Sequence, residues 1–255
     1  MDGVLYLGNT PIPGAARCLR ALERMGKHVG LITNNSGQSS ASVIRRLERL
    51  GFSAENIDVL VATSVTAEWL AEQRPGGTAY VVGSHELCGE IERAGLRVFA
   101  PSDTPPLPCD FLVVGNYRGI DYACLGRAIR VGRAGATFVA VNRDHLFPVE
   151  DGLRPGAGAI VQAIAAGIGR GPDVLIGKPS PLMVNRALQR AGLSPERCLM
   201  VGDTVDIDVR MGQAAGMATA LVLTGVDSKE TIATYDIRPT YVLDSIADIV
   251  DHLPV

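Results

Sequence analysis

The sequence predicts a Rossmann-like α/β protein built on a mostly parallel β-sheet with helices on both faces. Short apolar segments alternate with amphipathic segments of helical length along nearly the whole chain. The strand-like segments are almost continuously apolar, which is typical of parallel strands that are buried on both faces. Ligands bind such sheets at the carboxyl ends of the strands, and several polar clusters of this chain stand at those positions.

The predicted elements alternate in a regular order, and glycine or proline marks most of their ends. After a loop over 8–14, the predicted strands span 28–33, 58–62, 78–83, 110–115, 137–141, a segment from Val174, 199–201, 219–223 and 241–243. The predicted helices span 15–26, a segment from Ser39 or Ser40 to Gly51, a segment through Trp69, 86–94, 121–132, a segment opened by 155–158, one ending at Gly192, and shorter ones near the carboxyl end.

Two breaks rich in glycine and proline divide this pattern. The first is Arg74-Pro75-Gly76-Gly77 and the second lies over 167–172. Alternation restarts after the first break, and the earlier pattern resumes after the second. We therefore predict an inserted α/β module over 75–172, with 1–74 and 173–255 forming the main core.

Composition narrows the functional classes. The 255 residues are 47% hydrophobic, which is enough for one large core or two modest ones. A net charge of −3 argues against nucleic acid as a partner. Five scattered cysteines without a C-x-x-C pair indicate reduced thiols, and the histidine spacing does not suit zinc. No apolar run approaches the roughly 18 residues of a membrane span, and the amino end does not resemble a signal peptide. We therefore expect a cytoplasmic protein with no membrane partner.

The most informative stretch is the segment 201–208. A predicted strand ends at Gly202, and Asp203, Asp206 and Asp208 follow within six positions. Clustered carboxylates repel one another unless a cation or a hydrogen-bond network compensates them. Alternatively, Asp206 and Asp208 only occupy the first turn of a helix, where negative charge suits the helix dipole.

Polar residues also follow other predicted strands or turns, namely Asp2, Thr33-Asn34 and Lys178. A parallel sheet brings such positions to one edge. Carboxylates can bind Mg²⁺ through oxygen, while hydroxyl, amide and backbone N–H groups can hold phosphate oxygens. A lysine can neutralise phosphate charge. This inventory suits phosphoryl transfer, which depends on positioning and charge stabilisation.

Each of these features has a simpler explanation. Lys178 could be a solvated loop lysine, Thr33-Asn34-Asn35 could be turn residues, and Asn142 and Asp144 could cap a loop. The chain contains no G-x-x-x-x-G-K-[ST] sequence and no G-x-S-x-G sequence, so a P-loop nucleotide site and a serine-hydrolase elbow are both disfavoured.

Four motifs, taken in their order along the chain, resemble those of a known protein family. They are Asp2-Gly3-Val4-Leu5-Tyr6, Ile32-Thr33-Asn34-Asn35, Gly177-Lys178-Pro179-Ser180-Pro181, and Gly202-Asp203 with Asp208. In this order the chain resembles the haloacid dehalogenase-like (HAD) superfamily over nearly its full length. It is most similar to the NagD-like phosphatases of subclass IIA, with their 4-nitrophenylphosphatase and phosphoglycolate phosphatase relatives. In that branch an α/β cap domain lies between the second and third motifs, where we predict the inserted module.

The resemblance implies a role for each matched residue of the core. Asp2 would be the second aspartate of the family's D-x-D motif, acting as general acid and base and binding Mg²⁺ through its backbone carbonyl. Lys178 would bridge the phosphate and the nucleophile, and Asp203 would bind Mg²⁺. Asp208 would support either the metal shell or Lys178.

The resemblance also implies a set of substrate-binding residues. Thr33, Asn34 and Asn35 would hold the transferring phosphoryl group together with Lys178. Asn142 and Asp144, which flank Arg143, lie in the cap segment that would face the substrate.

The main departure from the family concerns the nucleophile. The first aspartate of D-x-D would stand two positions before Asp2, where this chain has no residue, since only Met1 precedes. A phosphoaspartate mechanism needs that carboxylate. Either Met1 is an internal methionine of a longer segment, or the protein is a non-hydrolysing member. We expect the former, because the other motifs are intact, and we expect the chain without that aspartate to be inactive or severely impaired.

The sequence therefore predicts a Mg²⁺-dependent phosphatase that hydrolyses a small phosphorylated metabolite, such as a nucleotide, a sugar phosphate or a glycolate-type phosphate, through a phosphoaspartate. The rival prediction is a phosphometabolite-binding protein without turnover. Dehalogenase chemistry would make little use of Asp203, and phosphonatase chemistry would need a cap lysine, which 78–172 lacks. The oligomeric state stays open, with a homodimer expected only by analogy with relatives.

Overall fold

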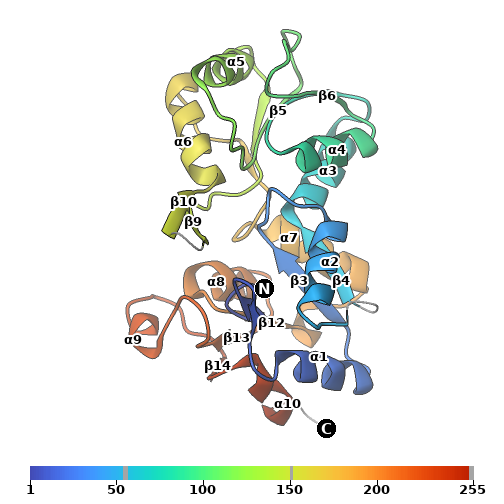
Figure 1. The fold of residues 1–255 in the computed structure, drawn as a ribbon, viewed down its shortest axis with the longest axis vertical. Helices are drawn as coiled ribbons and strands as arrows, with labels where there is room; N and C mark the ends of the chain where they lie inside the picture. The colour runs from blue at the N-terminus through green and yellow to red at the C-terminus, as the bar shows by residue number, and fades with distance from the viewer. Residues whose placement is uncertain (54–56, 150–151, 253–255) are drawn as a thin grey trace. The chain divides into compact units, whose positions relative to one another are not determined.

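The computed structural model describes residues 1–53, 57–149 and 152–252 (Figure 1). The chain divides into two compact units, each formed from segments that are distant in sequence. The first unit comprises Met1–Ile32, Ala41–Leu60 and Lys178–Val255, and the second comprises Thr33–Ser40 and Val61–Gly177.

The strands of the first unit form small sheets. β12 (Leu199–Gly202), β13 (Ala218–Val222) and β14 (Tyr241–Leu243) make a parallel sheet in that order. β3 (Val29–Thr33) pairs with β4 (Ile57–Val61), and β1 (Tyr6–Leu7) forms an antiparallel hairpin with β2 (Thr10–Pro11). Most of these strands carry the apolar residues that fill the interior, as expected for parallel sheets.

The register of the parallel sheet positions the loops that matter for function. Gly202 at the end of β12 pairs with Leu221, one residue before the end of β13. Because both strands run in the same direction, their carboxyl ends lie side by side at one edge of the sheet. The loops that follow Gly202 and Val222 therefore start next to each other.

Helices complete the first unit. α7 shows why they form: Ser180 caps its first turn by accepting the N–H of Leu182, Pro181 occupies the first position, and Gly192 ends it with a positive φ. The helices are α1 (Ala15–Arg24), α2 (Ser40–Arg49), α7 (Pro181–Ala191), α8 (Arg210–Ala214), α9 (Lys229–Ile232) and α10 (Ile249–His252), with the short turns η1 (Pro195–Arg197), η2 (Val205–Val209) and η3 (Ile246–Asp248).

The second unit contains a five-stranded parallel sheet with the order β11-β8-β7-β5-β6. Its strands are β5 (Thr78–Val82), β6 (Arg97–Phe99), β7 (Phe111–Val114), β8 (Thr137–Ala140) and β11 (Val174–Leu175), with an antiparallel hairpin of β9 (Leu146–Val149) and β10 (Gly152–Pro155). Its helices are α3 (Ala62–Gln73), α4 (His85–Arg93), α5 (Tyr122–Arg133) and α6 (Ala157–Ile168).

Helices cover both faces of this five-stranded sheet. α5 and α6 pack on the face that presents Tyr80, Leu112 and Phe138, and these side chains form one buried cluster. α3 and α4 lie on the other face (Figure 1), where the ring of Trp69 meets Phe111 edge to face with centroids 6.3 Å apart. The alternation of strand and helix thus produces the predicted layered arrangement.

The structure corrects the sequence prediction at short strands. The segment 8–14 is not entirely a loop, because it contains β2, which pairs with β1 in a hairpin. The β9–β10 hairpin and β6 were also not predicted. Strands of two to four residues give too few positions for a periodic pattern, and Pro11 and Pro148 argue against strands in single-sequence analysis.

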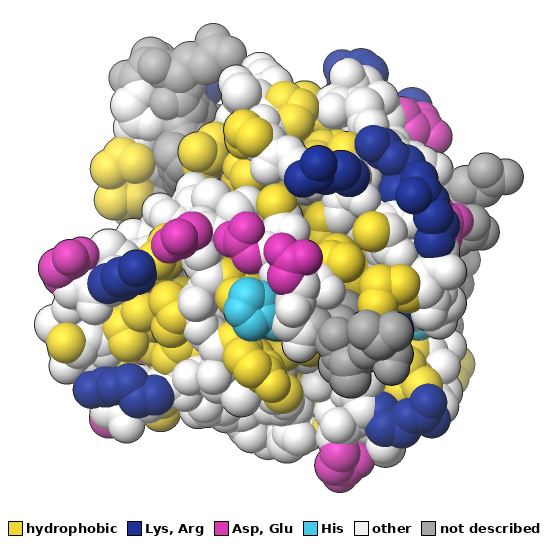
Figure 2. All heavy atoms as spheres, turned by 90° about the horizontal axis from the view of Figure 1, so that it is seen from below, with side chains coloured by type: hydrophobic (Ala, Val, Ile, Leu, Met, Phe, Trp, Pro, Cys, Tyr) yellow, Lys and Arg dark blue, Asp and Glu magenta, His cyan; other side chains and the backbone are white. Residues whose placement is uncertain are grey.

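One face of the molecule carries side chains of every kind. On the face in Figure 2, hydrophobic side chains are interspersed with acidic and basic ones. Large exposed hydrophobic residues include Tyr122 and Val226. Among the described residues, no helix combines the length and the apolar character needed to cross a membrane.

Candidate active site

Two buried carboxylates follow β12 directly. Asp203 comes immediately after the strand and Asp208 lies in η2, and the two residues are 9% and 3% exposed. Oδ2 of Asp208 accepts the backbone N–H of Asp203 at 3.2 Å and that of Thr204 at 3.3 Å. The segment 203–208, called the acidic loop below, therefore folds back so that its last carboxylate satisfies its first amides.

Lys178 forms an ion pair with the acidic loop. Its Nζ donates to Oδ1 of Asp208 at 2.7 Å, and the two side chains are 13% and 4% exposed. The alternative of a solvated loop lysine is therefore wrong. A buried ammonium needs a charged partner to offset its lost hydration, and Asp208 is that partner.

Electrostatics distinguish the two carboxylates. Burial raises the pKa of the Asp203 carboxyl, and the negative charge of Asp208 raises it further. Burial also opposes ionisation of Asp208, but the charge and hydrogen bond of Lys178, the nearby amino terminus and the N–H of Asp203 together outweigh it, so the pKa of Asp208 lies below its usual value. A nearby cation favours the ionised form of a carboxyl, so Asp203 has the most to gain from a bound cation.

The amino-terminal segment lies against the same loop. Gly3 has a φ of +74°, and a Cβ at this position would overlap Oδ2 of Asp203. The backbone carbonyl of Gly3 accepts Oγ1–H of Thr224 at 2.6 Å. The Asp2 side chain is exposed, and its Oδ1 accepts the N–H groups of Gly3 and Gly8 at 3.2 and 3.4 Å. The backbone next to Asp2 thus reaches Asp203, while the Asp2 carboxylate bonds toward the β1–β2 hairpin.

A second group of predicted residues lies in the second unit. Asn142 is 3% exposed, and its Nδ2 donates to the backbone carbonyl of Asn34 at 2.6 Å. Nδ2 of Asn34 donates to Oδ1 of Asp144 at 3.1 Å, and the N–H of Asp144 donates to Oδ1 of Asn142 at 3.1 Å. Arg143, between them, is exposed. The structure therefore brings Asn34 together with Asn142 and Asp144, which lie more than 100 positions further along the chain.

Thr33 and Asn35 do act as turn residues. Oγ1 of Thr33 accepts the N–H of Asn35 at 3.2 Å, and Oδ1 of Asn35 accepts the N–H of Gly37 at 2.9 Å. These bonds fix the turn after β3 and are compatible with a phosphate-binding loop. The predicted site residues thus fall into two groups: Asp2, Lys178, Asp203 and Asp208 in the first unit, and Thr33, Asn34, Asn35, Asn142 and Asp144 in the second.

Sequence reasoning missed Thr224 and Asp227, which follow β13. Asp227 is 5% exposed and bonds to the acidic loop through both backbone and side chain. The only signal in the sequence is a carboxylate placed shortly after an apolar strand and Gly225. That signal is weak, because polar residues are common in loops.

The residues present fit a magnesium ion. Among the described residues, no group of three or more His, Cys, Asp or Glu could hold a metal ion. Mg²⁺, however, usually keeps several waters and binds through one or two carboxylates. Asp203 supplies such a hard oxygen ligand, and a Cβ on Gly225 would overlap its Oδ2, so the backbone encloses that carboxylate closely.

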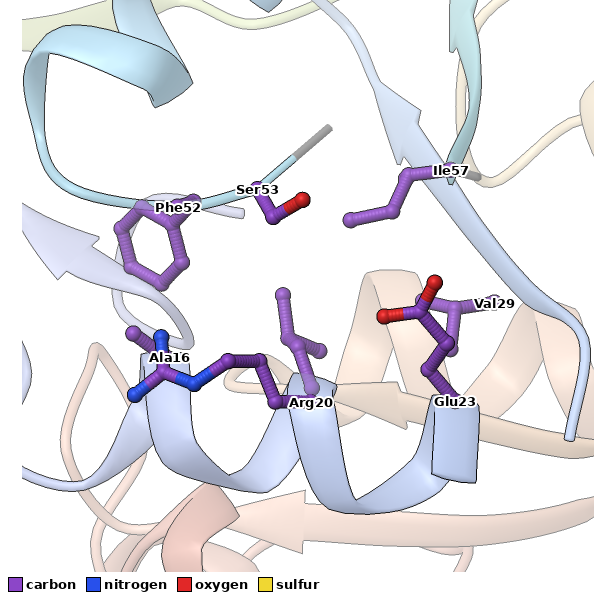
Figure 3. Close-up of a pocket in the computed structure, with 8 residues that line it drawn as sticks. Ala16, Arg20, Glu23, Val29, Phe52, Ser53 and Ile57 are labelled. Atoms are coloured by element: carbon purple, nitrogen blue, oxygen red, sulfur yellow. The ribbon is translucent and has the colours of Figure 1, made fainter. Parts of the chain in front are cut away.

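A pocket elsewhere in the first unit is separate from these residues. In Figure 3, Arg20 and Glu23 extend from α1, with Phe52, Ser53 and Ile57 opposite. No predicted site residue lines this pocket.

Comparison with known proteins identifies the class. The profile of the haloacid dehalogenase-like hydrolases matches residues 1–97, and a HAD-hydrolase-like profile matches residues 175–249. The chain is 35% identical to dihydroxyacetone phosphatase from Corynebacterium glutamicum (strain R), over 98% of this chain and 89% of that protein. The chain therefore belongs to the haloacid dehalogenase-like hydrolases.

Solved structures place it within that family. NagD from E. coli K-12 is 31% identical and superimposes with a TM-score of 0.88, covering 97% of this chain and 95% of NagD. Glycerol phosphate phosphatase from Mycobacterium tuberculosis, solved in complex with magnesium, is 32% identical with a TM-score of 0.87, covering 96% and 73%. The predictions of a NagD-like α/β fold and of a phosphomonoester hydrolase are confirmed.

Proposed function

We propose that this protein is a Mg²⁺-dependent phosphatase of a small phosphorylated metabolite. The observation that carries the proposal is the buried Lys178–Asp208 ion pair next to the buried carboxylate of Asp203. Relatives named for dihydroxyacetone and glycerol phosphates support a sugar-type or glycerol-type phosphate as substrate. Nucleotide and glycolate-type phosphates belong to the same chemical class.

Each core residue has a specific role in this proposal. Asp203 and the backbone carbonyl of Asp2 would hold Mg²⁺, which when bound neutralises charge on the phosphoryl oxygens. Lys178, oriented by Asp208, binds a phosphate oxygen as a point charge. The Asp2 carboxyl gives a proton to the leaving oxygen and later takes one from the attacking water.

In the second unit, Thr33, Asn34 and Asn35 would contact the phosphoryl group through hydroxyl, amide and backbone N–H donors. Asn142 and Asp144 would complete the substrate side of the site, since both bond to Asn34. We propose 75–172 as the cap domain around this group and 1–74 with 173–255 as the catalytic core. A cytoplasmic location and a homodimer remain part of the proposal.

The proposed reaction passes through a phosphoaspartate. By resemblance the nucleophile stands two positions before Asp2, which is one position before the first residue of the printed sequence. Residues of this chain would bind the substrate, orient the phosphoryl group and move protons, while the aspartate at that position attacks phosphorus and expels the alcohol. A phosphometabolite-binding protein without turnover is the alternative.

A phosphatase assay tests the proposal. The chain extended at its amino end by an apolar segment and an aspartate two positions before Asp2 should release phosphate from a sugar phosphate or glycerol phosphate only with Mg²⁺. The same extension with asparagine should not. In the active form, Lys178→Ala should lower kcat/KM by about 100-fold or more, the usual effect of removing a group that stabilises transition-state charge.

Lys229→Ala is the matched control, because that lysine side chain is 68% exposed, and it should retain activity. Normal Mg²⁺-dependent turnover in Lys178→Ala would overturn the role of Lys178. If the chain extended with the aspartate bound a phosphate ester but did not hydrolyse it, the alternative of a phosphometabolite-binding protein would be favoured.

A further inference from the structure

The loop after β13 contacts the acidic loop at several points. This loop spans 223–228 and is called the clamp loop below. Its Val226 N–H donates to Oδ2 of Asp203 at 3.1 Å, and the N–H of Asp227 donates to the backbone carbonyl of Asp203 at 3.0 Å. Both the side chain and the main chain of Asp203 are therefore fixed by the clamp loop.

The carboxylate of Asp227 holds the other part of the acidic loop. Its Oδ2 accepts the N–H of Val205 at 2.6 Å, in a buried position. Val205 is the first residue of η2, the turn that carries Asp208. A carboxylate at the start of a helical turn satisfies an N–H that has no partner within the turn. Asp227 thus bonds to the loop on both sides of Thr204.

Two hydroxyl groups further along the chain hold the Asp227 carboxylate in place. Its Oδ1 accepts Oγ1–H of Thr231 at 2.9 Å and the O–H of Tyr235 at 3.3 Å. Tyr235 packs against the cluster that contains Val205 and Ile232. The carboxylate therefore has donors on both oxygens and little freedom to move.

We propose that Asp227 is a positioning residue that sets the affinity of the acidic loop for a divalent cation. The proposal rests on the proposed function, because it takes Asp203 as the cation ligand. Its carboxylate acts by fixing the start of η2, while its main-chain N–H, which substitution of the side chain leaves in place, holds the backbone carbonyl of Asp203. Without this carboxylate, the amide of Val205 loses its acceptor and η2 loosens, so Asp208, which lies in η2 and accepts the N–H of Asp203, no longer holds Asp203 in place.

Direct cation binding tests this inference without any turnover. Mn²⁺, a common substitute for Mg²⁺, is titrated into the chain, and free Mn²⁺ is counted by electron paramagnetic resonance, with Mg²⁺ as competitor. Asp227→Ala should raise the Kd for Mn²⁺ by about tenfold or more, the usual cost of removing a group that orients a metal ligand. Asp227→Asn should raise it less, because an amide oxygen can still accept the N–H of Val205.

Asp206→Ala is the matched control. That carboxylate lies in the same loop, but its side chain is 59% exposed and pairs with Arg210. Its removal should leave the Kd unchanged. If Asp227→Ala does not fold, a double variant that combines Thr231→Val with Tyr235→Phe takes its place. This hydroxyl-deleted variant lacks both hydroxyl donors to Asp227, and its Kd for Mn²⁺ should be raised by about threefold.

The outcomes separate the two proposals. An unsubstituted chain that binds no Mn²⁺ in competition with Mg²⁺ would overturn the Mg²⁺ part of the proposed function, and the role of Asp227 with it. An unsubstituted chain that binds Mn²⁺, together with Asp227→Ala or the hydroxyl-deleted variant binding equally well, would overturn the role of Asp227 alone. An equal loss of Mn²⁺ affinity in Asp206→Ala would also overturn the role of Asp227, because the effect would then come from the removed charge and not from positioning.

Discussion

At the scale of single residues, the buried Lys178–Asp208 ion pair limits which substitutions the site can tolerate. Both side chains are nearly removed from water, and Asp208 also accepts two backbone N–H groups. Breaking a buried pair by removing one charge is costly, because the other charge stays buried without compensation. A substitution at either residue therefore affects folding as well as chemistry.

Asp208→Asn should lower the free energy of unfolding by about 3–5 kcal/mol, since Lys178 would remain buried after losing the adjacent negative charge of Asp208. Urea unfolding followed by circular dichroism at neutral pH measures this change. Asp206→Asn, in the same turn, is the control and should change stability by less than about 1 kcal/mol, because that carboxylate is exposed. A loss below about 1 kcal/mol in Asp208→Asn would contradict the prediction.

The contacts of single residues also show which parts of the site could be predicted from the sequence alone. Lys178, Asp203 and Asp208 were predicted to meet because strand ends of a parallel sheet converge, and within the first unit the lysine and Asp208 do meet. Asp227 was not predicted, because its partner Val205 lies 22 positions away and contributes only a backbone N–H. A main-chain donor leaves no trace in the residue pattern.

At the scale of elements, prediction succeeded where a segment was long or continuously apolar. β14 was predicted at its observed bounds, and α1 and α5 were predicted to within two residues. The β1–β2 and β9–β10 hairpins failed, because their strands are too short to show alternation and contain proline. The bond from Asn142 to Asn34 was likewise not predictable, since it depends on how β3 and β8 end in space.

Asp110 links two strands of the second unit and should make their stability depend on pH. Its Oδ2 accepts both the N–H and the hydroxyl of Thr78 at 2.8 Å, and its Oδ1 pairs with Arg74 at 2.9 Å. The backbone N–H of Thr78, then its hydroxyl, holds the pKa of Asp110 below its usual value. A carboxyl with a lowered folded-state pKa stabilises the protein above its unfolded pKa, and this contribution is lost as pH falls through the folded pKa.

Asp110→Asn should therefore lower the free energy of unfolding by about 1–2 kcal/mol at neutral pH. The difference from the unsubstituted chain should shrink as the pH falls below about 4, where the unfolded carboxyl begins to bind a proton. Urea unfolding over a pH series measures it, and Asp244→Asn, an exposed carboxylate, is the control. A difference that stays constant down to the acid limit would show that the hydrogen bonds do not depend on the charge of Asp110.

At the scale of the whole molecule, the turn after β3 is the most informative feature. Although it continues a strand that starts in the first unit, Thr33–Ser40 belongs to the second. Hydrogen bonds hold it there, among them those from Asn142 to the carbonyl of Asn34, from the N–H of Asn116 to Oγ of Ser36, and from Oγ1 of Thr63 to the carbonyl of Gln38. The proposed phosphate-binding turn should therefore unfold and refold locally together with the second unit.

Hydrogen exchange can detect this division. Ile164→Ala removes a fully buried side chain from the second unit and should cost about 2–5 kcal/mol. Because units that open separately lose protection separately, this change should speed amide exchange in β5, β7 and Asn116, while β12 and β13 stay protected. Met211→Ala, an equally buried truncation in the first unit, should do the reverse. If either variant lowered protection equally throughout, the chain would unfold as one cooperative body, and the turn that holds Asn34 could not open independently of the acidic loop.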